Sequence, residues 1–307
     1  MAAALLCSQT KVKLRYYIPI LIFLLALSSC ERTDSYSNPD ELIVCLSVSE
    51  DYDKTVNKVE AFHSYLEKSL GMKVKIFKVT NGSAVVEAMK AKKIHLGSTG
   101  AFSYMVAKSK IDIRPLVTSA SVSTDTIHQY WSCLIVPKDS PIKNVNDLID
   151  QKNKLTLAWS YPTSTSGHLV PRDFLSKIGI EQEDFKDVMV SESHVASLYN
   201  CISGKIDVAA VNNTTLSTYL KRGKIKKEDY RIIWESEPIP RGAIFVSSDL
   251  NDQLATKIQK ALTDLDDIDP EASQKIHYQY EYPIKYVSID DSYYDSLRMM
   301  AKKSGLL

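Results

Sequence analysis

Short apolar runs alternate along the chain with stretches in which apolar residues recur every three or four positions. The run from Leu42 to Val48 predicts a buried strand, and the spacing from Val56 to Leu70, closed by Gly71, predicts a helix. Such alternation is typical of a parallel sheet covered by helices. In the first third of the chain we expect strands at 42–48, at 74–79 and beginning at 94–96, and helices at 56–70 and 84–92.

The same alternation restarts near residue 131, with strands and helices of ordinary length. It ends in a shorter section that contains the turn 237–240. The expected strands are 131–136, 155–159, 188–190, 206–211, 230–234 and 243–246, and the expected helices are 144–149, 167–178, 194–203, 214–221, 250–265 and 293–303.

The restart indicates that a second α/β unit is inserted into the first. The chain would cross between the two units near 119–130 and again near 234–242. We therefore predict an α/β fold with two lobes, joined by two crossover strands and separated by a cleft. Lobe 1 is expected at 41–125 and 240–307, and lobe 2 at 126–239.

The first 29 residues have the pattern of an export signal. A basic flank (Lys11, Lys13 and Arg15) precedes an apolar segment, and small residues then lead to Cys30. The segment Leu27-Ser28-Ser29-Cys30 resembles a bacterial lipobox, which would make Cys30 the lipidated first residue of the mature protein. A plain signal peptide or a short anchor helix is the alternative. Residues 30–40 are expected to form a polar tether.

Composition narrows the range of functions. Removal of the three basic residues of the signal, which contains no acidic one, takes the formal charge from +1 to −2, and no basic run suggests nucleic acid. The cysteines Cys45, Cys133 and Cys201 are widely spaced and are expected to be buried residues. We expect a monomer that holds neither a metal nor a cofactor.

The stretch Ser164-Thr165-Ser166-Gly167 lies where the strand at 155–159 passes into a helix. The first turn of a helix has unpaired N–H groups with partial positive charge, and neutral hydroxyls add further donors. A tetrahedral oxyanion would fit there. An ordinary Ser/Thr helix cap is the alternative.

Several other predicted strands also end in small polar residues, where ligands of open α/β sheets bind. Ser98 and Thr99 follow one strand, although they could instead cap the helix that opens at Ala101. Asn212 follows another strand. His194 could donate to an oxyanion or could face solvent at the start of its helix.

Enzyme motifs are mostly absent: the chain has no G-x-S-x-G, H-E-x-x-H or P-loop sequence. Ser166 and His194 could form a nucleophile and base. No acidic residue is placed by the sequence to orient that histidine, so we expect binding and not catalysis.

Several segments have a specific order and spacing along the chain. They are 130–136, 139–142, 164–167 with 169–171, 193–194, 207–209 with 212–214, and 238–240. In these segments the chain resembles the phosphonate-binding proteins of ABC transporters, within the phosphate/phosphite/phosphonate group of periplasmic binding proteins. The resemblance extends from about Leu42 to past Val246.

The resemblance implies a type II-like periplasmic-binding-protein fold that closes on its ligand. It implies that Ser164, Thr165, Ser166 and His194 hold the phosphonyl oxygens, and that the 97–100 turn contributes from the other lobe. Thr99 stands where relatives often have tyrosine. Tyr130 would line the cleft.

Two positions depart from relatives that bind aminoalkyl phosphonates. Those relatives pair the ligand's ammonium with two acidic residues, and this chain has Thr215 and the pair Arg241-Gly242 at the corresponding places. An unpaired buried ammonium would be costly. We therefore expect phosphate, phosphite, methylphosphonate or a phosphonate with a second anionic group on Arg241, unless Arg241 is only a solvated hinge charge.

The function expected from the resemblance is an extracytoplasmic solute-binding lipoprotein that captures a phosphonate, phosphite or phosphate for an ABC transporter. Its partners would be a permease, an ATPase and a membrane reached through lipid on Cys30. A ligand-binding sensor module for a membrane receptor is the alternative.

Overall fold

The computed structural model describes residues 36–47, 52–124, 126–277 and 283–307. The expected signal, Cys30 and the first part of the tether lie outside the described residues. Residues 40–307 form one compact unit. Among the described helices, none is both long and apolar enough to span a membrane.

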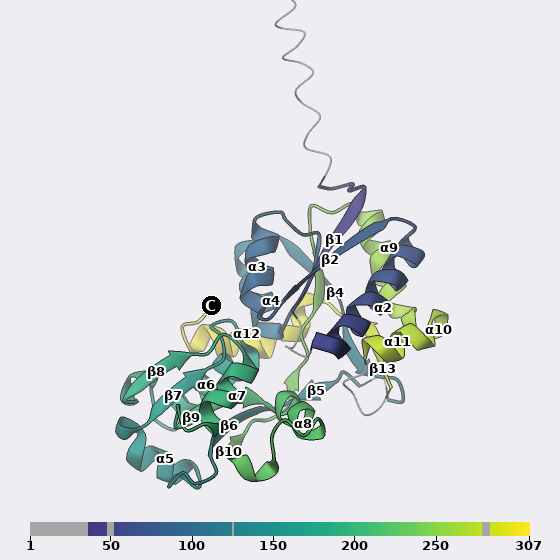
Figure 1. Cartoon of the computed structure of the whole chain (residues 1–307). Helices are drawn as coiled ribbons and strands as arrows, with labels where there is room; N and C mark the ends of the chain where they lie inside the picture. The colour runs from purple at the N-terminus through teal and green to yellow at the C-terminus, as the bar shows by residue number, and fades with distance from the viewer. Residues whose placement is uncertain (1–35, 48–51, 125, 278–282) are drawn as a thin grey trace, which may run out of the picture. The chain divides into compact units, whose positions relative to one another are not determined.

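The larger of two main sheets has six strands in the order β13-β4-β12-β3-β1-β2 (Figure 1). β1 pairs in parallel with β2 and β3, while β12 pairs antiparallel with β3 and β4, and β13 antiparallel with β4. The strands are β1 (Glu41–Ser47), β2 (Lys73–Val79), β3 (Leu96–Ser98), β4 (Ile113–Ser121), β12 (Ile244–Ser247) and β13 (Ile284–Ser288).

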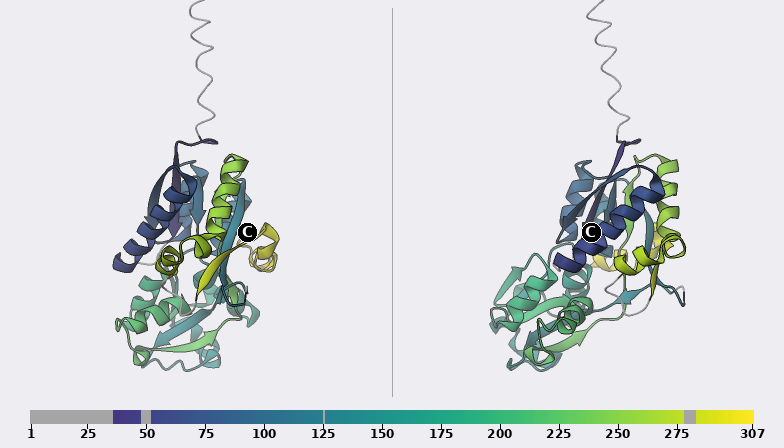
Figure 2. Two further views of the ribbon diagram at one scale, coloured as in Figure 1. Left: turned by 90° about the vertical axis from the view of Figure 1, so that its right-hand side faces the viewer. Right: turned by 45° about the vertical axis from the view of Figure 1, so that its right-hand side comes forward.

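The smaller sheet is built from the middle of the chain and has the order β10-β6-β9-β7-β8. β7 pairs in parallel with β8 and β9, and β6 pairs antiparallel with β9 and β10. In both views of Figure 2 its teal and green segments lie below the larger sheet. The strands are β6 (Ser132–Pro137), β7 (Thr156–Trp159), β8 (Asp187–Val190), β9 (Val208–Asn212) and β10 (Tyr230–Glu235).

A short antiparallel ribbon lies between the two sheets in sequence, where the chain passes from one to the other. It consists of β5 (Gln129–Tyr130) and β11 (Ile239–Pro240). The prediction of a two-lobe α/β fold with two crossover strands is therefore confirmed. The strands of the larger sheet fall within 41–121 and 244–288, and those of the smaller within 132–235; the precise lobe boundaries stay a prediction.

Helices cover both faces of each sheet and bury separate apolar clusters. On the larger sheet α2, α9, α10 and α11 cover one face, and α3, α4 and α12 the other. On the smaller sheet α5 and α6 lie opposite α7 and α8. The helices are α2 (Tyr52–Leu70), α3 (Gly82–Lys90), α4 (Ala101–Lys110), α5 (Val145–Gln151), α6 (Val170–Lys177), α7 (His194–Ile202), α8 (Asn213–Lys221), α9 (Asp252–Thr263), α10 (Leu265–Ile268), α11 (Pro270–Ile276) and α12 (Asp295–Lys303).

Most expected elements are present, with a few differences. β4, β13 and α11 were not predicted, because polar and half-buried positions interrupt their apolar patterns. The third strand starts at Leu96 and not at 94, and the helix expected at 250–265 ends at Thr263, before a separate turn of helix. The helix expected at 167–178 begins at Val170, directly after a single π-turn at Thr165–Leu169.

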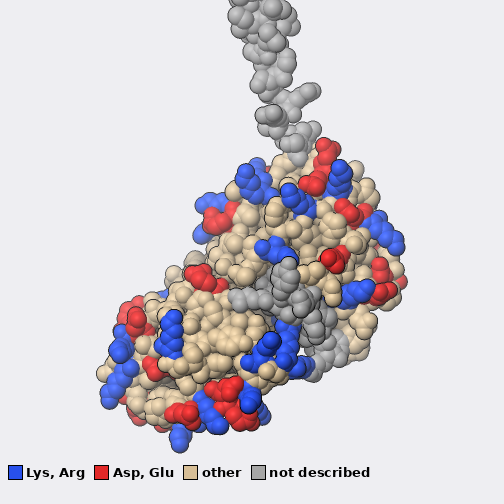
Figure 3. All heavy atoms as spheres, in the orientation of Figure 1, with Lys and Arg blue, Asp and Glu red and all other residues tan. Residues whose placement is uncertain are grey.

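Acidic and basic side chains are interspersed on the face drawn in Figure 3. The three cysteines Cys45, Cys133 and Cys201 are buried and free, as the sequence predicted.

Candidate functional site

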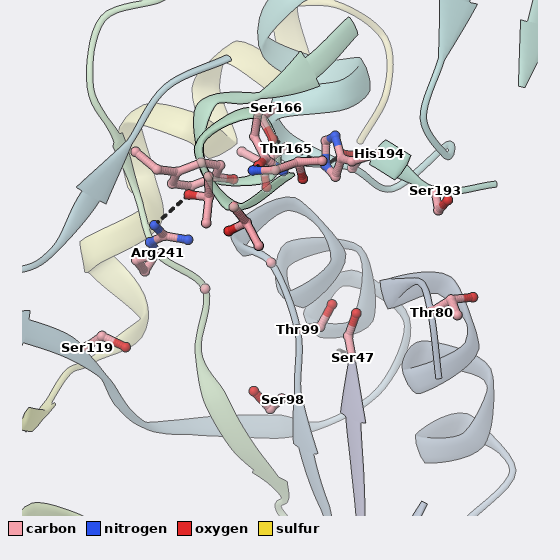
Figure 4. Close-up of a pocket in the computed structure, with 18 of the residues that line it drawn as sticks. Ser47, Thr80, Ser98, Thr99, Ser119, Thr165, Ser166, Ser193, His194 and Arg241 are labelled. Carbon is pink, nitrogen blue, oxygen red and sulfur yellow. Dashed lines mark hydrogen bonds between the residues drawn. The ribbon is translucent and has the colours of Figure 1, made fainter. Parts of the chain in front are cut away.

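A cavity of about 290 Å³ lies between the two sheets and is lined from both lobes. We call the lobe built on the six-stranded sheet the larger lobe and the lobe built on the five-stranded sheet the smaller lobe. In Figure 4, Thr165, Ser166 and His194 of the smaller lobe lie across from Ser47, Ser98 and Thr99 of the larger lobe. Hydroxyl groups dominate the lining. All of the expected ligand-binding residues except Gly167 line the cavity: Ser98, Thr99, Tyr130, Ser164, Thr165, Ser166, His194, Asn212 and Arg241.

The stretch 164–167 forms a tight turn at the carboxyl end of β7. Ser164 is the N-cap residue, and its Oγ accepts from the N–H of Gly167 at 2.9 Å. Leu169 N–H bonds to the Ser164 carbonyl at 3.0 Å, five residues back, which makes this a π-turn of the kind often found at functional sites. Ser164 therefore caps the helix, and the turn also places the hydroxyl side chains of Ser164, Thr165 and Ser166 on the cavity wall.

Gly167 is required by the packing behind this turn. A Cβ at this position would lie 2.3 Å from Ser160 Oγ and 2.8 Å from His194 Cε1, far inside contact distance. The carbonyl of Gly167 also accepts from Ser160 N–H at 2.9 Å. Glycine thus lets the turn approach the end of β7 and the histidine ring directly.

His194 begins α7 and is held through both of its ring nitrogens. Its Nδ1 lies 2.9 Å from Ser160 Oγ, and its Nε2 lies 3.2 Å from Ser164 Oγ and 3.5 Å from Ser166 Oγ. Burial lowers the pKa of His194 to about 4, because the charged ring would lose its hydration. His194 is therefore neutral at pH 7 and lies half-buried in the cavity wall.

Thr165 also joins the two lobes. Its Oγ1 accepts from the N–H of Phe102 in the first turn of α4, at 2.9 Å. Next to it, Ser103 Oγ donates to the carbonyl of Thr163 at 2.9 Å, and the hydroxyls of Ser83 and Thr163 are 2.9 Å apart. These contacts hold the 163–165 turn of the smaller lobe against α3 and α4 of the larger lobe.

Arg241 follows the ribbon strand β11 and is fixed on three sides. Its guanidinium carbon lies 4.5 Å from the centre of the Tyr130 ring, its Nε donates to His128 Nδ1 at 2.9 Å, and its Nη2 donates to Thr214 Oγ1 at 3.0 Å. Burial and the nearby Arg241 charge lower the pKa of His128 to about 4, so that His128 can accept. Arg241 is half-buried in the cavity wall and is not a fully solvated hinge charge.

The remaining expected residues contribute in different ways. Thr99 is buried but does not cap α4, whose N-cap is Gly100 and has no side-chain cap; this alternative was wrong. Thr99 Oγ1 has no hydrogen-bond partner among the described residues. Asn212 caps α8, with its Oδ1 accepting from Thr215 N–H at 2.7 Å, while also lining the cavity.

Several residues that shape the site were not among the predicted ligand-binding residues. Ser160 holds the histidine, His128 and Thr214 hold Arg241, and Thr163 makes contacts between the lobes. Ser160 directly follows an apolar strand and could have been found as a polar strand-end residue. Thr214 belongs to the polar strand-end segment 212–214, but no sequence signal pointed to its contact with Arg241. None pointed to the contacts of His128 and Thr163 either, because their partners are far away in the chain.

Comparison of the sequence with known proteins finds one family model and two similar proteins. A family model described as "ABC transporter, phosphonate, periplasmic substrate-binding protein" matches residues 46–294. The phosphonates-binding periplasmic protein of Escherichia coli is 32% identical over 194 residues, which are 63% of this chain and 56% of that protein's length. A probable phosphite-binding protein of an ABC transporter in Prochlorococcus marinus is 25% identical over 203 residues, covering 65% of this chain and 67% of that protein.

Comparison of structures finds the same fold. The structure of PhnD1 from Prochlorococcus marinus in complex with methylphosphonate matches with a TM-score of 0.76 and 22% identity. The match covers 88% of this chain and 100% of that one. At this identity the likeness shows the two-lobe fold alone.

Proposed function

The chain belongs to the ABC-transporter family of periplasmic phosphonate-binding proteins, and we propose from this membership that it captures a small phosphorus oxyanion between its lobes. It would deliver the ligand to a membrane permease that is driven by a cytoplasmic ATPase. The observation that supports this most is the hydroxyl-lined cavity between the lobes, with the 164–167 turn on one wall and Arg241 on another. Closure around a ligand would present one shape to the permease.

We assign the phosphorus end of the ligand to Ser164, Thr165, Ser166 and His194. A tetrahedral oxyanion needs several donors that converge, and hydroxyls with backbone N–H groups supply them without a buried countercharge. Ser98, Thr99 and Tyr130 would contribute across the cavity, and Gly167 shapes the turn.

The rest of the cavity favours a ligand without an ammonium group. Among the described residues that line it, Arg241 and Lys58 are basic and none is acidic. A buried ammonium with no carboxylate partner would be costly. We therefore propose phosphate, phosphite, methylphosphonate or a phosphonate with a second anionic group as the ligand.

The family consists of binding proteins and not of enzymes. The geometry agrees with this, since Nδ1 of His194 bonds to the hydroxyl of Ser160 and not to a carboxylate that would orient a catalytic base.

A screen by thermal unfolding and calorimetry tests the proposed function. Phosphate, phosphite, methylphosphonate and phosphonoacetate would be compared with chloride, and at least one should raise the unfolding temperature by mass action. The double variant Ser166→Ala with His194→Ala should lose that shift and keep its fold. Ser109→Ala, which removes a hydroxyl bonded only within α4, is the matched control. Failure of every phosphorus oxyanion to bind would refute the function.

Because no described residue of the cavity lining carries a carboxylate, we expect the site to discriminate against ligands with an ammonium group. 2-Aminoethylphosphonate should bind at least tenfold more weakly than the best ligand of the screen, since each tenfold is about 1.4 kcal/mol and an unpaired buried charge costs more than that. Calorimetric titration measures both affinities. Sub-micromolar affinity for 2-aminoethylphosphonate would contradict it.

We also propose that residues 1–29 direct export and that Cys30 carries a lipid, which would hold the domain at the outer side of the membrane through the 30–40 tether. Incorporation of labelled palmitate by cells that express the full chain, lost in Cys30→Ala, would support this. Unlabelled protein released from the cells would contradict it.

A further inference from the structure

The hydrogen bonds around Ser160 determine which nitrogen of His194 carries the proton. Ser160 is fully buried at the carboxyl end of β7, and its Oγ lies 2.9 Å from the carbonyl oxygen of Ala210, 2.9 Å from His194 Nδ1 and 3.3 Å from Ser197 Oγ. A hydroxyl has one proton, and a carbonyl can only accept. The proton of Ser160 therefore goes to Ala210, so that Ser160 Oγ accepts from an N–H at Nδ1 of His194.

Nε2, the second ring nitrogen of the neutral histidine, is consequently unprotonated and can only accept a hydrogen bond. Nε2 lies in the cavity wall, at 3.2 Å from Ser164 Oγ and 3.5 Å from Ser166 Oγ. Ser164 Oγ already accepts from Gly167 N–H, so its own proton is available to Nε2. A ligand O–H that donates to Nε2 would take the place of this bond, since the nitrogen has one lone pair, and would leave the Ser164 hydroxyl able to donate to another oxygen of the ligand. The cavity wall that offers donors to an oxyanion thus also contains one fixed acceptor.

Nothing described against the ring supplies a charge that would change this state. Ser160, the 164–167 turn and Ala210 contribute neutral groups, and burial is the cause of the lowered pKa of His194. The titratable side chain of Tyr161 packs edge-on to the ring, with the ring centres 5.9 Å apart, and burial raises its pKa to about 12. The other titratable groups that line the cavity are Arg241, Lys58, Tyr130, Tyr219, His277 and Tyr286.

This inference rests on the proposed function and concerns the protonation of its ligand. We propose that the bound phosphorus oxyanion carries one proton on the oxygen that faces His194 Nε2, and that Ser160 is the positioning residue that imposes this. A protonated oxygen donates to Nε2, whereas a bare anionic oxygen would face a lone pair. The site then selects hydrogen-phosphonate monoanions over sulfonates, whose oxygens hold no proton near neutral pH.

The proton can come from the ligand itself or from solvent. Below the second pKa of the free ligand, the monoanion brings its own proton and none is exchanged. Above that pKa, the free ligand is a dianion, and binding must take up one proton from the buffer. Affinity should then fall about tenfold for each pH unit, since a proton is part of the binding equilibrium.

Titration calorimetry tests this directly with the purified protein and methylphosphonate. At a pH more than one unit above the second pKa of methylphosphonate, heats in two buffers of different ionisation enthalpy should give an uptake of about one proton per ligand. Methanesulfonate, which has the same shape, should bind at least tenfold more weakly. Binding of methylphosphonate without proton uptake, or equal affinity for the two, would overturn the inference and leave the proposed function in place.

Two serine variants distinguish a role of Ser160 in fixing the proton of His194 from a general effect of losing a buried hydroxyl. Ser160→Ala removes the acceptor that fixes Nδ1–H, so His194 can carry its proton on Nε2 and donate to a dianion. Proton uptake should then fall toward zero and the preference over methanesulfonate should narrow. Ser197→Ala, which keeps the Ser160–Ala210 bond, should retain the uptake. Equal uptake in both variants would overturn the role of Ser160.

The nitrogen chemical shifts of His194 provide a readout that does not depend on the ligand. In ¹⁵N-labelled protein the Nδ1 resonance should be that of a protonated nitrogen and the Nε2 resonance that of a bare one. The opposite pattern would overturn the inference even if Ser160→Ala fails to fold. If no phosphorus oxyanion binds at all, the proposed function and this inference both fail.

Discussion

Gly167 matters at the residue scale because of the side chain that it lacks. A methyl group there would overlap Ser160 Oγ at 2.3 Å and Ser160 Cβ at 2.5 Å, and would press on His194. Gly167→Ala should therefore displace the histidine, reduce oxyanion affinity at least tenfold and cost about 1–3 kcal/mol of stability, as overpacking usually does.

Calorimetry and urea unfolding measure the two effects of Gly167→Ala. Ser109→Ala is the control, because it changes a side chain that bonds only within α4 and lies outside the cavity lining. Unchanged affinity in Gly167→Ala would show that the turn can shift without disturbing the site.

The contacts of Arg241 depend on the planar shape of its guanidinium group and not only on its positive charge. Its contacts with His128, Thr214 and the Tyr130 ring use the shape of the guanidinium, which lysine does not have. Arg241→Lys should weaken binding of phosphonoacetate about tenfold, because charged hydrogen bonds are worth about 1.5–3 kcal/mol. Methylphosphonate, which has no second anion, should be affected less. Parallel titrations decide this, and equal losses for both ligands would exclude a specific role for Arg241.

At the scale of elements, the site is made where strand ends and helix starts meet. β7 leads to the 164–167 turn, β9 ends at Asn212 and α7 begins with His194. Because β7 and β9 run parallel as neighbours, their carboxyl ends reach the same edge of the smaller sheet. The first turn of α4 then meets this edge from the larger lobe through Phe102 and Thr165.

The contacts between these elements should contribute to ligand affinity. Ser103 Oγ lies 2.8 Å from Thr163 Oγ1 and donates to the Thr163 carbonyl, and both bonds join the two lobes. Ser103→Ala should reduce ligand affinity about threefold to tenfold, since each net hydrogen bond is worth about 0.5–1.5 kcal/mol. Ser109→Ala in the same helix should leave affinity unchanged. Small-angle scattering should detect a larger open population in Ser103→Ala; equal compactness would argue against a role in closure.

At the scale of the whole molecule, buried histidines make stability depend on pH. Burial lowers the pKa of His128 and His194 to about 4 and that of His277 to about 3, from an ordinary value of 6.5. In the unfolded chain these rings bind protons as the pH falls below 6.5, while in the folded protein they do not. Stability is therefore fully present above pH 6.5 and is lost as the pH falls toward 4.

Urea unfolding across this range should show the loss. With about 1.4 kcal/mol for each pKa unit, His194 alone accounts for about 3 kcal/mol. His194→Gln should flatten the profile between pH 6.5 and 4 by about that amount. A profile as steep as that of the unmodified protein would mean that His194 is not a source of the pH dependence.

Much of the architecture could be predicted from the sequence, because most strands and helices have strong apolar periodicity. The elements that were missed have weak patterns: β4 and β13 carry polar or half-buried positions, and α11 is short. The polar strand-end residues of the site could also be predicted, since Ser164, Thr165, Ser166 and His194 do meet at one cavity. Their roles toward a ligand stay predictions that the experiments above can test.

The sequence by itself determined the two-lobe α/β plan and the turn of hydroxyls, because these depend on local periodicity and on helix-start chemistry. Only the tertiary structure decided how the site is held. Ser160 and Ala210 are 50 residues apart in the chain, and Arg241 and His128 are 113 apart. Hydrogen bonds between such distant residues follow from strand order and lobe packing, and the position of the proton on His194 follows from them in turn.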